Sequence, residues 1–308
     1  MQLIRFISLA LVVLVLPTAA HAALACSVSM TDEAFGSIDV LTGTSYSTTA
    51  TVTVSCSGGS ASQNVRACIS IAAGSGGSDA TSRLMSGPAA AALRFDLYSD
   101  SGMSTVWNND VILDFTLNAG GSGNGSRTVY GKILGGQQTA PAGSYSSTFA
   151  SSPSIKYGPQ PSDSSCVLSD TASTSFMATA TVLSNCALSA SNLNFGAVGV
   201  LVSSVNGQSS LSVQCNTSLA YAISLDGGNA GASDPTQRKM SFGGRDITYG
   251  LFQDSSRSQP WGSSSGVNTV SGTGTGASQS ITVYGRVPAQ PTPPPATYSD
   301  TIVVTVTY

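Results

Sequence analysis

The chain has 308 residues, a formal net charge of −3, one histidine and only 9% charged side chains. The single histidine, His21, lies in an N-terminal segment that we expect to be removed. This excludes an imidazole nucleophile, an imidazole base and a histidine-ligated metal in the mature chain. The acidic balance, 15 Asp and Glu against 12 Lys and Arg, argues against a nucleic-acid partner. We therefore expect no conventional active site, no metal and no cofactor.

Residues 1–22 are typical of a secretory signal peptide. Arg5 supplies the positive charge, residues 6–16 form an apolar stretch, and Ala20-His21-Ala22 fits a cleavage site. The apolar stretch is too short to span a bilayer. A second cleavage motif before Cys26 resembles a lipoprotein signal, so lipidation is the alternative. We expect an exported mature chain that begins at residue 23.

Two copies of one pattern make up the mature chain. Each copy begins with a Cys-x8-Phe-Gly motif and has a second cysteine at nearly the same spacing, and the register continues far beyond it. A register held over this length indicates two homologous domains, which we place at 23–184 and 185–308. The matching positions are Cys26 and Cys186, Cys56 and Cys215, Leu97 and Leu251, Asp100 and Asp254, Trp107 and Trp261, and the Val-Tyr-Gly motifs at 129–131 and 283–285.

The six cysteines of an exported chain are expected to form disulfides. The repeat assigns one bond to each copy and leaves two cysteines inside the first copy. The predicted bonds are Cys26-Cys56, Cys186-Cys215 and Cys68-Cys166.

Short β-branched runs fill both copies, and no segment of a dozen residues has a helical period. The predicted strands, in chain order, are 47–55, 66–72, 126–134, 209–216, 220–226 and 280–287. Short strands in this number, with a disulfide between sheets, are typical of an immunoglobulin-like sandwich. We expect an all-β protein of two tandem immunoglobulin-like β-sandwich domains. Trp107 and Trp261 recur in both copies, so we assign them to the core, with a ligand platform as the alternative.

These motifs, together with the closing run 298–308, resemble the spore coat protein U domain family over essentially the whole mature chain. Two such domains on one exported chain are similar to the two-domain tip adhesins of Csu-type archaic chaperone-usher pili. The resemblance implies a surface fibre of incomplete immunoglobulin-like subunits, each completed by a strand from its neighbour. It also implies a periplasmic pilus chaperone, an outer-membrane usher, and a role in attachment and biofilm formation at the cell surface.

The mechanism of strand donation gives each domain a different expected role. Residues 23–25 are too few to form a donor strand before Cys26, so we expect the tip position. The segment 176–183 alternates, with Phe176, Ala178, Ala180 and Val182 on one face, and we expect it to close the first domain. Nothing follows the last strand of the second domain, which we expect to lack one strand and to receive a neighbouring pilin's donor strand.

The candidate docking residues for the donor strand and the chaperone are Ile302, Val304, Val306 and Tyr308. The alternative is that 302–308 is an ordinary edge strand of a closed sandwich.

Apolar residues in the predicted loops of the first domain are candidates for adhesion to an abiotic or host surface, because exposed apolar patches mark interaction sites. The resemblance implies hydrophobic loop tips at the end of the domain away from the linker. The candidates are Leu84, Met85, Pro88, Ala90, Val111, Ile112, Leu113 and Pro141. The run 111–115 is equally consistent with a buried strand.

Other classes of function have weaker support. Asp96, Asp100, Asp110 and Asp114 are close in sequence, and a glycosidase needs two carboxylates, but the recurrence of Asp100 in the second copy favours a turn. We therefore expect no enzyme. A structural spore-coat-like or pilus shaft protein and a secreted carbohydrate-binding module remain as alternatives, although a shaft subunit should carry a donor segment and a sugar site should expose aromatic side chains.

Overall fold

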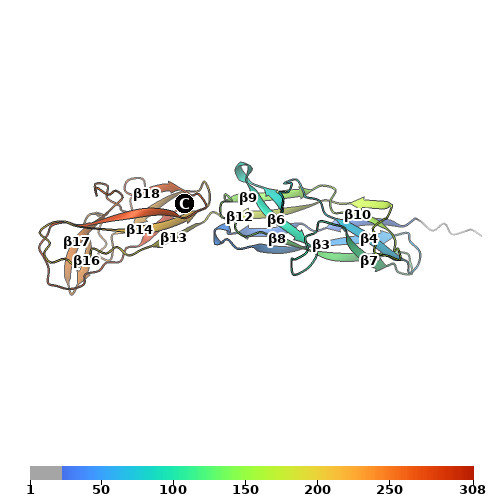
Figure 1. Cartoon of the computed structure of the whole chain (residues 1–308), viewed down its shortest axis with the longest axis horizontal. Helices are drawn as coiled ribbons and strands as arrows, with labels where there is room; N and C mark the ends of the chain where they lie inside the picture. Colours follow the sequence, from blue (N-terminus) through green and yellow to red (C-terminus); the bar gives the residue numbers. More distant parts are fainter. Residues whose placement is uncertain (1–22) are drawn as a thin grey trace, which may run out of the picture.

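The computed structural model describes residues 23–308 and shows two β-sandwich domains joined end to end (Figure 1). The predicted signal peptide lies outside the described residues. Domain 1 comprises β1 to β12 and domain 2 comprises β13 to β20, and each has its own apolar core. The expected fold class, all-β with immunoglobulin-like sandwiches, is confirmed. Residues 23–308 contain no helix of a length and apolarity that would cross a membrane.

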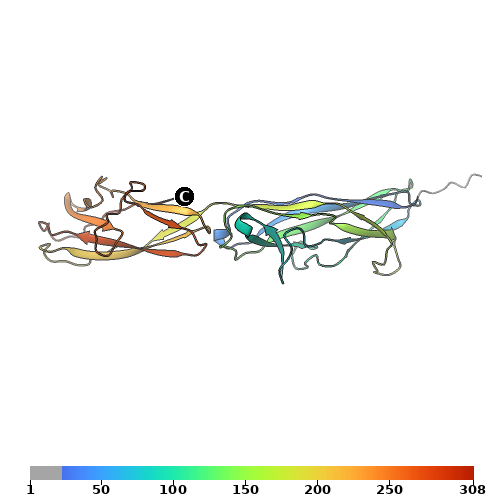
Figure 2. The same cartoon turned by 90° about the horizontal axis from the view of Figure 1, so that it is seen from above.

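Domain 1 packs a large sheet against a small one (Figure 2). The eight-stranded sheet has, in spatial order, β1 (Ala25–Met30), β3 (Tyr46–Ser57), β8 (Gly123–Ile133), β6 (Ala92–Tyr98), β5 (Arg83–Ser86), β9 (Gly143–Phe149), β12 (Phe176–Val182) and β2 (Glu33–Ile38). The four-stranded sheet has β11 (Asp170–Ser173), β10 (Ser154–Pro159), β4 (Asn64–Ser70) and β7 (Val111–Thr116). Two 3₁₀ turns, η1 (Val40–Thr42) and η2 (Pro88–Ala90), lie between strands.

Domain 2 repeats this plan with fewer strands. Its five-stranded sheet has β13 (Cys186–Ala190), β14 (Val205–Cys215), β19 (Gln279–Val287), β17 (Arg245–Phe252) and β16 (Arg238–Phe242). Its three-stranded sheet has β18 (Val270–Thr273), β15 (Ala220–Leu225) and β20 (Val304–Thr307). Within residues 23–308, no strand of domain 2 corresponds to β2, β9, β11 or β12.

The period of two along the strands explains the cores. In β3, alternate residues Ala50, Val52, Val54 and Cys56 are buried while their neighbours face outward. The two tryptophans lie fully in the cores. Their indole N–H groups donate to carbonyls of neighbouring strands, Trp107 to Ile69 and Trp261 to Ile223, both at 3.0 Å. This identical bond shows that β4 and β15 are counterparts.

Three disulfides hold the domains: Cys26–Cys56, Cys68–Cys166 and Cys186–Cys215. Two of them join counterpart strand pairs, β1 to β3 in domain 1 and β13 to β14 in domain 2. The third joins β4 to the long connection 160–169, which has no counterpart in the described part of domain 2. Such bonds fit a chain that folds in an oxidising compartment.

Candidate functional site

Strand β12 closes the large sheet of domain 1. It pairs antiparallel with β9 and parallel with β2, so it fills the space between them. Its side chains alternate in burial: Phe176, Ala178, Ala180 and Val182 are at most 4% exposed. The Phe176 ring stacks on Phe149 of β9 at 4.2 Å between centroids. The inward face of β12 is therefore part of the core.

The corresponding place in domain 2 holds no strand of residues 23–308. The segment 296–302 is the counterpart of β9, because a bridge joins Ser299 to Ser241 of β16 as another joins Ser146 to Ser86 of β5. The segment 191–198 is the counterpart of β2. Between these two segments lies a groove of about 580 Å³, which we call the open groove.

The open groove is lined by half-buried apolar side chains from both sheets. They are Leu193, Phe195, Met240, Ile302 and Val304. The counterpart of Met240 in domain 1, Met85, is 0% exposed. On the segment 191–198 itself, Val198 is 44% exposed where Ile38 of β2 is 0% exposed. The missing strand thus accounts for the exposure of an apolar surface that would otherwise be core.

The backbone along one rim of the open groove is free to pair. The amide of Ser299 donates to Ser241 and so faces away from the groove. Among the described residues, the amides of Tyr298 and Ile302 have no backbone hydrogen-bond partner. Because alternate amides of an extended segment point to opposite sides, these donors can pair with an added strand.

A hydrogen bond inside the open groove fixes the same rim. The Tyr249 hydroxyl donates to Asp300 Oδ2 at 2.7 Å, and Asp300 also accepts from the Asn229 amide at 2.8 Å. Burial, followed by this bond to a carboxylate, raises the pKa of Tyr249 far above its usual range. The phenol therefore stays neutral. Leu211, Leu251 and Val283 provide an apolar floor between polar rims, which suits an extended segment that alternates apolar and polar side chains.

The structure brings part of the predicted docking set to this groove. Ile302 and Val304 line it. Val306 lies further along β20, paired with Ile223, and Tyr308 is 54% exposed near the junction of the domains. The opposite rim, 190–195, was not predicted from the sequence. A signal was present, because Phe195 belongs to the Phe-Gly motif that both copies share.

Several candidate adhesive residues are in the wrong environment for contact with a surface. Met85 is 0% and Leu113 is 6% exposed, because both face the core from strands β5 and β7. Leu84 is half-buried within β5. Val111 and Ile112 belong to β7, so the strand alternative is correct for 111–115.

The remaining candidates lie near domain 2 instead of at the end away from the linker. Pro88 lies against Gly143 at the start of β9, next to the end of β12, and Ala90 is exposed on the same turn. Pro141 accepts a hydrogen bond from the Tyr145 hydroxyl at 2.8 Å in the loop that touches domain 2. The loop was misplaced because sequence spacing does not show which end of a strand pair a turn occupies.

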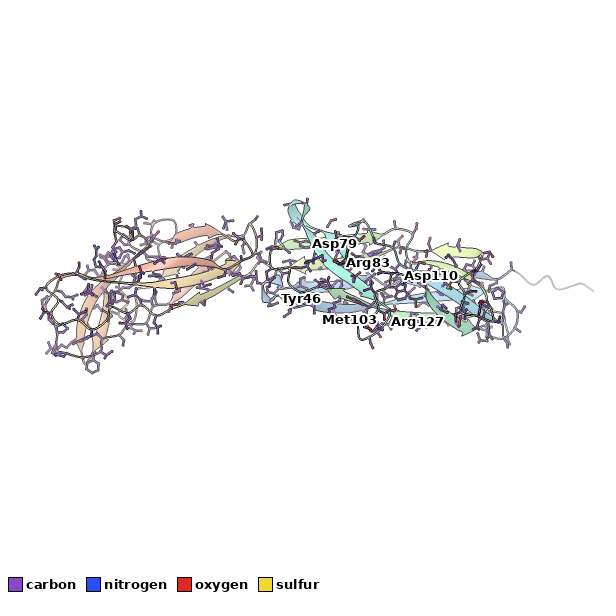
Figure 3. All side chains as sticks on the ribbon, viewed as in Figure 1. Tyr46, Asp79, Arg83, Met103, Asp110 and Arg127 are labelled. Carbon is purple, nitrogen blue, oxygen red and sulfur yellow. A yellow bond between two sulfur atoms is a disulfide. The ribbon has the colours of Figure 1, made fainter. Side chains whose placement is uncertain are left out.

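The distal end of domain 1 is formed by three other loops, 57–63, 117–122 and 160–169. Backbone hydrogen bonds join the first two loops, Gly59 to Gly121 at 3.2 Å and Ser62 to Asn118 at 3.3 Å, and the Gln160 amide joins the third loop to Asn64 of β4 at 3.0 Å. Their sequences are rich in Gly and Ser, but Val167 is 90% exposed. Figure 3 shows Tyr46 toward the junction and Asp110 further toward the distal end.

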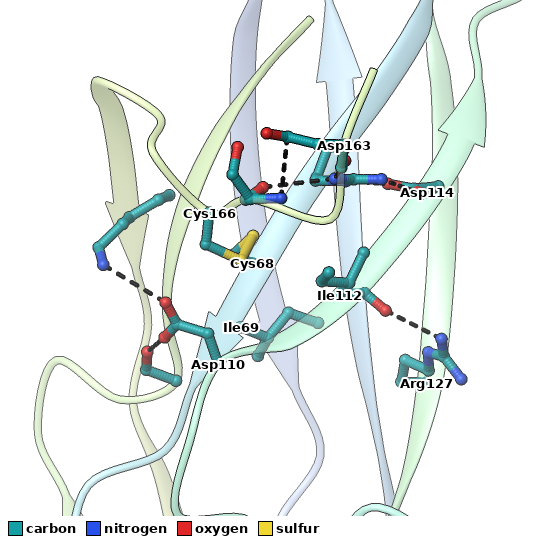
Figure 4. The surroundings of a disulfide bond; sticks show 12 residues. Cys68, Ile69, Asp110, Ile112, Asp114, Arg127, Asp163 and Cys166 are labelled. Carbon is teal, nitrogen blue, oxygen red and sulfur yellow. Dashed lines mark hydrogen bonds and ion pairs between the residues drawn. A yellow bond between two sulfur atoms is a disulfide. The ribbon is translucent and has the colours of Figure 1, made fainter. Parts of the chain in front are cut away.

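The loop 160–169 is held firmly (Figure 4). The Cys68–Cys166 bond joins it to β4, and the Arg66 guanidinium donates to the carbonyls of Asp163 and Ser165. Arg66 also makes two bonds of 2.8 Å to the Asp114 carboxylate, which hold the pKa of Asp114 below its usual value. Val167 therefore projects from a fixed loop.

The carboxylates that raised the possibility of a hydrolase have structural partners. Asp96 pairs with the buried Arg83 at 3.0 Å, and Asp110 binds Ser70 and lies 3.4 Å from the Lys156 ammonium. Asp100 accepts backbone amides of its own turn, as Asp254 does in domain 2. Residues 23–308 contain no group of three or more His, Cys, Asp or Glu side chains placed to hold a metal.

The chain is a two-domain all-β protein whose repeated sandwich has one closed and one open copy. The model of the Spore Coat Protein U domain matches residues 12–151 and 172–305, and the chain belongs to this family. Protein U of Myxococcus xanthus is 34% identical over 128 residues, which cover 38% of this chain and 71% of that protein.

A solved structure shares the fold over most of the chain. The chaperone–tip adhesion subunit pre-assembly complex CsuC–CsuE, from archaic chaperone-usher Csu pili of Acinetobacter baumannii, matches with a TM-score of 0.56 and 18% identity. The match covers 92% of this chain and 100% of that chain. The CupB6 tip adhesin of Pseudomonas aeruginosa matches with a TM-score of 0.39 and 12% identity over 92% of this chain and 94% of that chain.

Proposed function

We propose that this chain is a non-catalytic tip subunit of an archaic chaperone-usher pilus. The observation that carries the proposal is the open groove of domain 2, at the place where domain 1 holds β12. A neighbouring pilin donates an extended segment to this groove, and the pilus grows from domain 2. Domain 1, already complete, stands at the end of the fibre and mediates attachment to a surface and biofilm formation.

The open groove also accounts for a periplasmic chaperone and an outer-membrane usher as partners. An exposed apolar floor beside unpaired backbone donors promotes aggregation, so the subunit needs a temporary partner before assembly. The outer edge of β20 has no partner strand in residues 23–308, whereas β11 covers the same edge of β10 in domain 1. We assign the chaperone contact to this edge and the groove rim, from Ile302 to Tyr308.

We place adhesion at the distal end of domain 1. This end lies at the opposite end of the molecule's long axis from domain 2, which holds the open groove (Figure 1). The fixed loop 160–169 with the exposed Val167 is the apolar element there. Of the residues expected from the sequence, the buried Met85 and Leu113 are excluded from this surface.

The test is to supply the missing strand in cis. Residues 160–184, which contain β11 and β12, are repeated after Tyr308, so that domain 2 is followed by the segment that closes domain 1. Filling the groove buries its apolar surface, which stabilises domain 2 by about 25 cal/mol per Å² removed from water. We expect a higher melting temperature of domain 2 and soluble protein without a chaperone.

The matched control carries Ala178→Asp and Ala180→Asp in the repeated segment only, because two charges cannot enter the apolar floor. This control should behave like the unextended chain. An extension that leaves both melting temperature and aggregation unchanged, with or without the two substitutions, would show that the groove does not accept a strand.

A further inference from the structure

A short connection joins domain 2 to domain 1, and the two domains are in contact. Strand β12 ends at Val182 and β13 begins at Cys186, so the connecting chain spans at most about 14 Å. The Asn185 side chain donates to Asp39 Oδ2 at 2.7 Å. Gly276 of domain 2 approaches Gln138 and Thr139 so closely that a Cβ atom on it would lie 2.6 Å from their backbone. The closing strand thus brings a second domain into contact.

Domain 2 has a counterpart of the surface that receives it. Gln137 exchanges two hydrogen bonds with the backbone of Arg94, and Gln290 makes the same pair with Thr248. The residues after each glutamine therefore correspond, Gln138 and Thr139 to Pro291 and Thr292. On the neighbouring turn, Val200 takes the place of Val40. We call residues 199–202 and 290–292 the outer end of domain 2.

The outer end of domain 2 is a single, solvent-exposed surface. The Leu201 amide donates to Thr292 Oγ1 at 2.9 Å, and the Gln290 amide donates to the Leu201 carbonyl at 2.9 Å, so the two segments form one surface. Val200 is 63% and Val202 is 80% exposed. On domain 1, the counterpart Val40 is 4% exposed.

We propose that the outer end of domain 2 is a stacking surface for the body of the neighbouring subunit. The partner is a domain of the same fold whose first strand follows the donated strand after a short connection, as β13 follows β12. This inference rests on the proposed function and extends it, because the neighbour then contributes a folded domain as well as a strand.

The chemistry of the contact differs from that at the junction of domains 1 and 2. Gly199 stands where domain 1 has Asp39, and neither segment of the outer end contains a charged residue. The Asn185–Asp39 hydrogen bond is therefore not repeated, and Val200, Val202 and Pro291 provide an apolar contact. A neighbouring domain should present an uncharged turn to it, as Gly276 does to domain 1.

Two extended chains separate strand filling from stacking. In the short form, residues 160–184 follow Tyr308. In the long form, residues 160–308 follow it, and the added copy of domain 2 is isotope-labelled by segmental ligation and serves as the probe. Oxidation is read on the unlabelled domain 2, because the labelled copy has an empty groove of its own. Hydroxyl-radical footprinting then compares the oxidation of Met240, which lines the groove, with that of Val202 and Pro291. We expect protection of Met240 in both forms and several-fold protection of Val202 and Pro291 in the long form alone.

A substitution in the long form locates the contact. Val202→Asp should restore oxidation of Pro291 while Met240 stays protected, whereas Val267→Asp, at a site 82% exposed and away from the outer end, should change neither. Equal oxidation of Val202 and Pro291 in the two forms, with Met240 protected in both, would overturn stacking and leave the groove intact. Unprotected Met240 in both forms would overturn the proposed function and this inference with it.

Discussion

Glu33 stands where domain 2 has Leu193. A Cβ atom on Gly131 would lie 2.6 Å from Glu33 Oε2, and one on its counterpart Gly285 would lie 2.9 Å from Leu193 Cδ1. Glu33 is 0% exposed, and neither carboxylate oxygen has a hydrogen-bond partner within residues 23–308. Burial raises the pKa of Glu33 to about 8, although the nearby backbone amide of Ala50 acts in the opposite direction.

This carboxyl makes the stability of domain 1 depend on pH. The folded-state pKa of about 8 lies above the reference value of 4.5, so the protonated form favours folding. Its contribution is complete below pH 4.5 and is lost as the pH rises toward 8, at about 1.4 kcal/mol per pH unit. We expect Glu33→Gln to remove this pH-dependent loss of stability. Urea unfolding of both proteins between pH 5 and 8.5 measures the loss. A difference in unfolding free energy between the two proteins that does not change with pH would contradict the prediction.

Val167 provides a test of adhesion by a single side chain. Val167→Asp places a charge on a site that is 90% exposed, so the fold should be unaffected. If the distal end contacts a hydrophobic surface, attachment of bacteria with assembled pili to polystyrene should fall several-fold. Val267→Asp, at 82% exposure on domain 2, is the matched control. Equal attachment by both variants, at normal pilus numbers, would place adhesion elsewhere.

At the scale of elements, β12 divides the chain into a closed and an open domain. The alternation in 176–183 was enough to predict a strand that closes domain 1. The neighbouring β11, 170–173, has half-exposed and exposed residues and no apolar period, so its pairing with β10 could not be predicted. Leu84 and Met85 looked like loop residues because Gly87 and Pro88 follow them, yet β6 and β9 bury their strand.

The inward face of β12 should dominate the stability of domain 1. Phe176 is 3% exposed and stacks on Phe149, so Phe176→Ala should lower the unfolding free energy by about 3–5 kcal/mol. The neighbouring Met177 is 39% exposed on the outer face, and Met177→Ala should change it by less than about 0.5 kcal/mol. Chemical denaturation of both variants measures the difference; losses of equal size would mean that β12 is not part of the core.

At the scale of the whole molecule, the repeat in the sequence predicts two domains but not their arrangement. The contact between them depends on Asp39, Gln138 and Asn185, polar residues in turns that carry no periodic signal. The Cys68–Cys166 bond lies at the distal end of domain 1, where it closes a stretch of 98 residues. Domain 1 thus has a disulfide at its distal end, and domain 2 has the open groove. The junction between the two domains sets their relative orientation.

Gly276 allows this junction to be tested without unfolding either domain. Gly276 has a φ of 76° and Gly266 has a φ of 72°, so an alanine at either position meets the same left-handed backbone strain. A Cβ atom on Gly266, however, would have no neighbour within 4 Å. A Cβ atom on Gly276 would collide with Gln138 and Thr139, so Gly276→Ala should separate the domains, and small-angle X-ray scattering should show a more variable end-to-end length. Gly266→Ala, with equal strain and no contact, should leave the scattering curve unchanged. Identical curves for both variants would mean that the Asn185–Asp39 bond and the short connection fix the orientation by themselves.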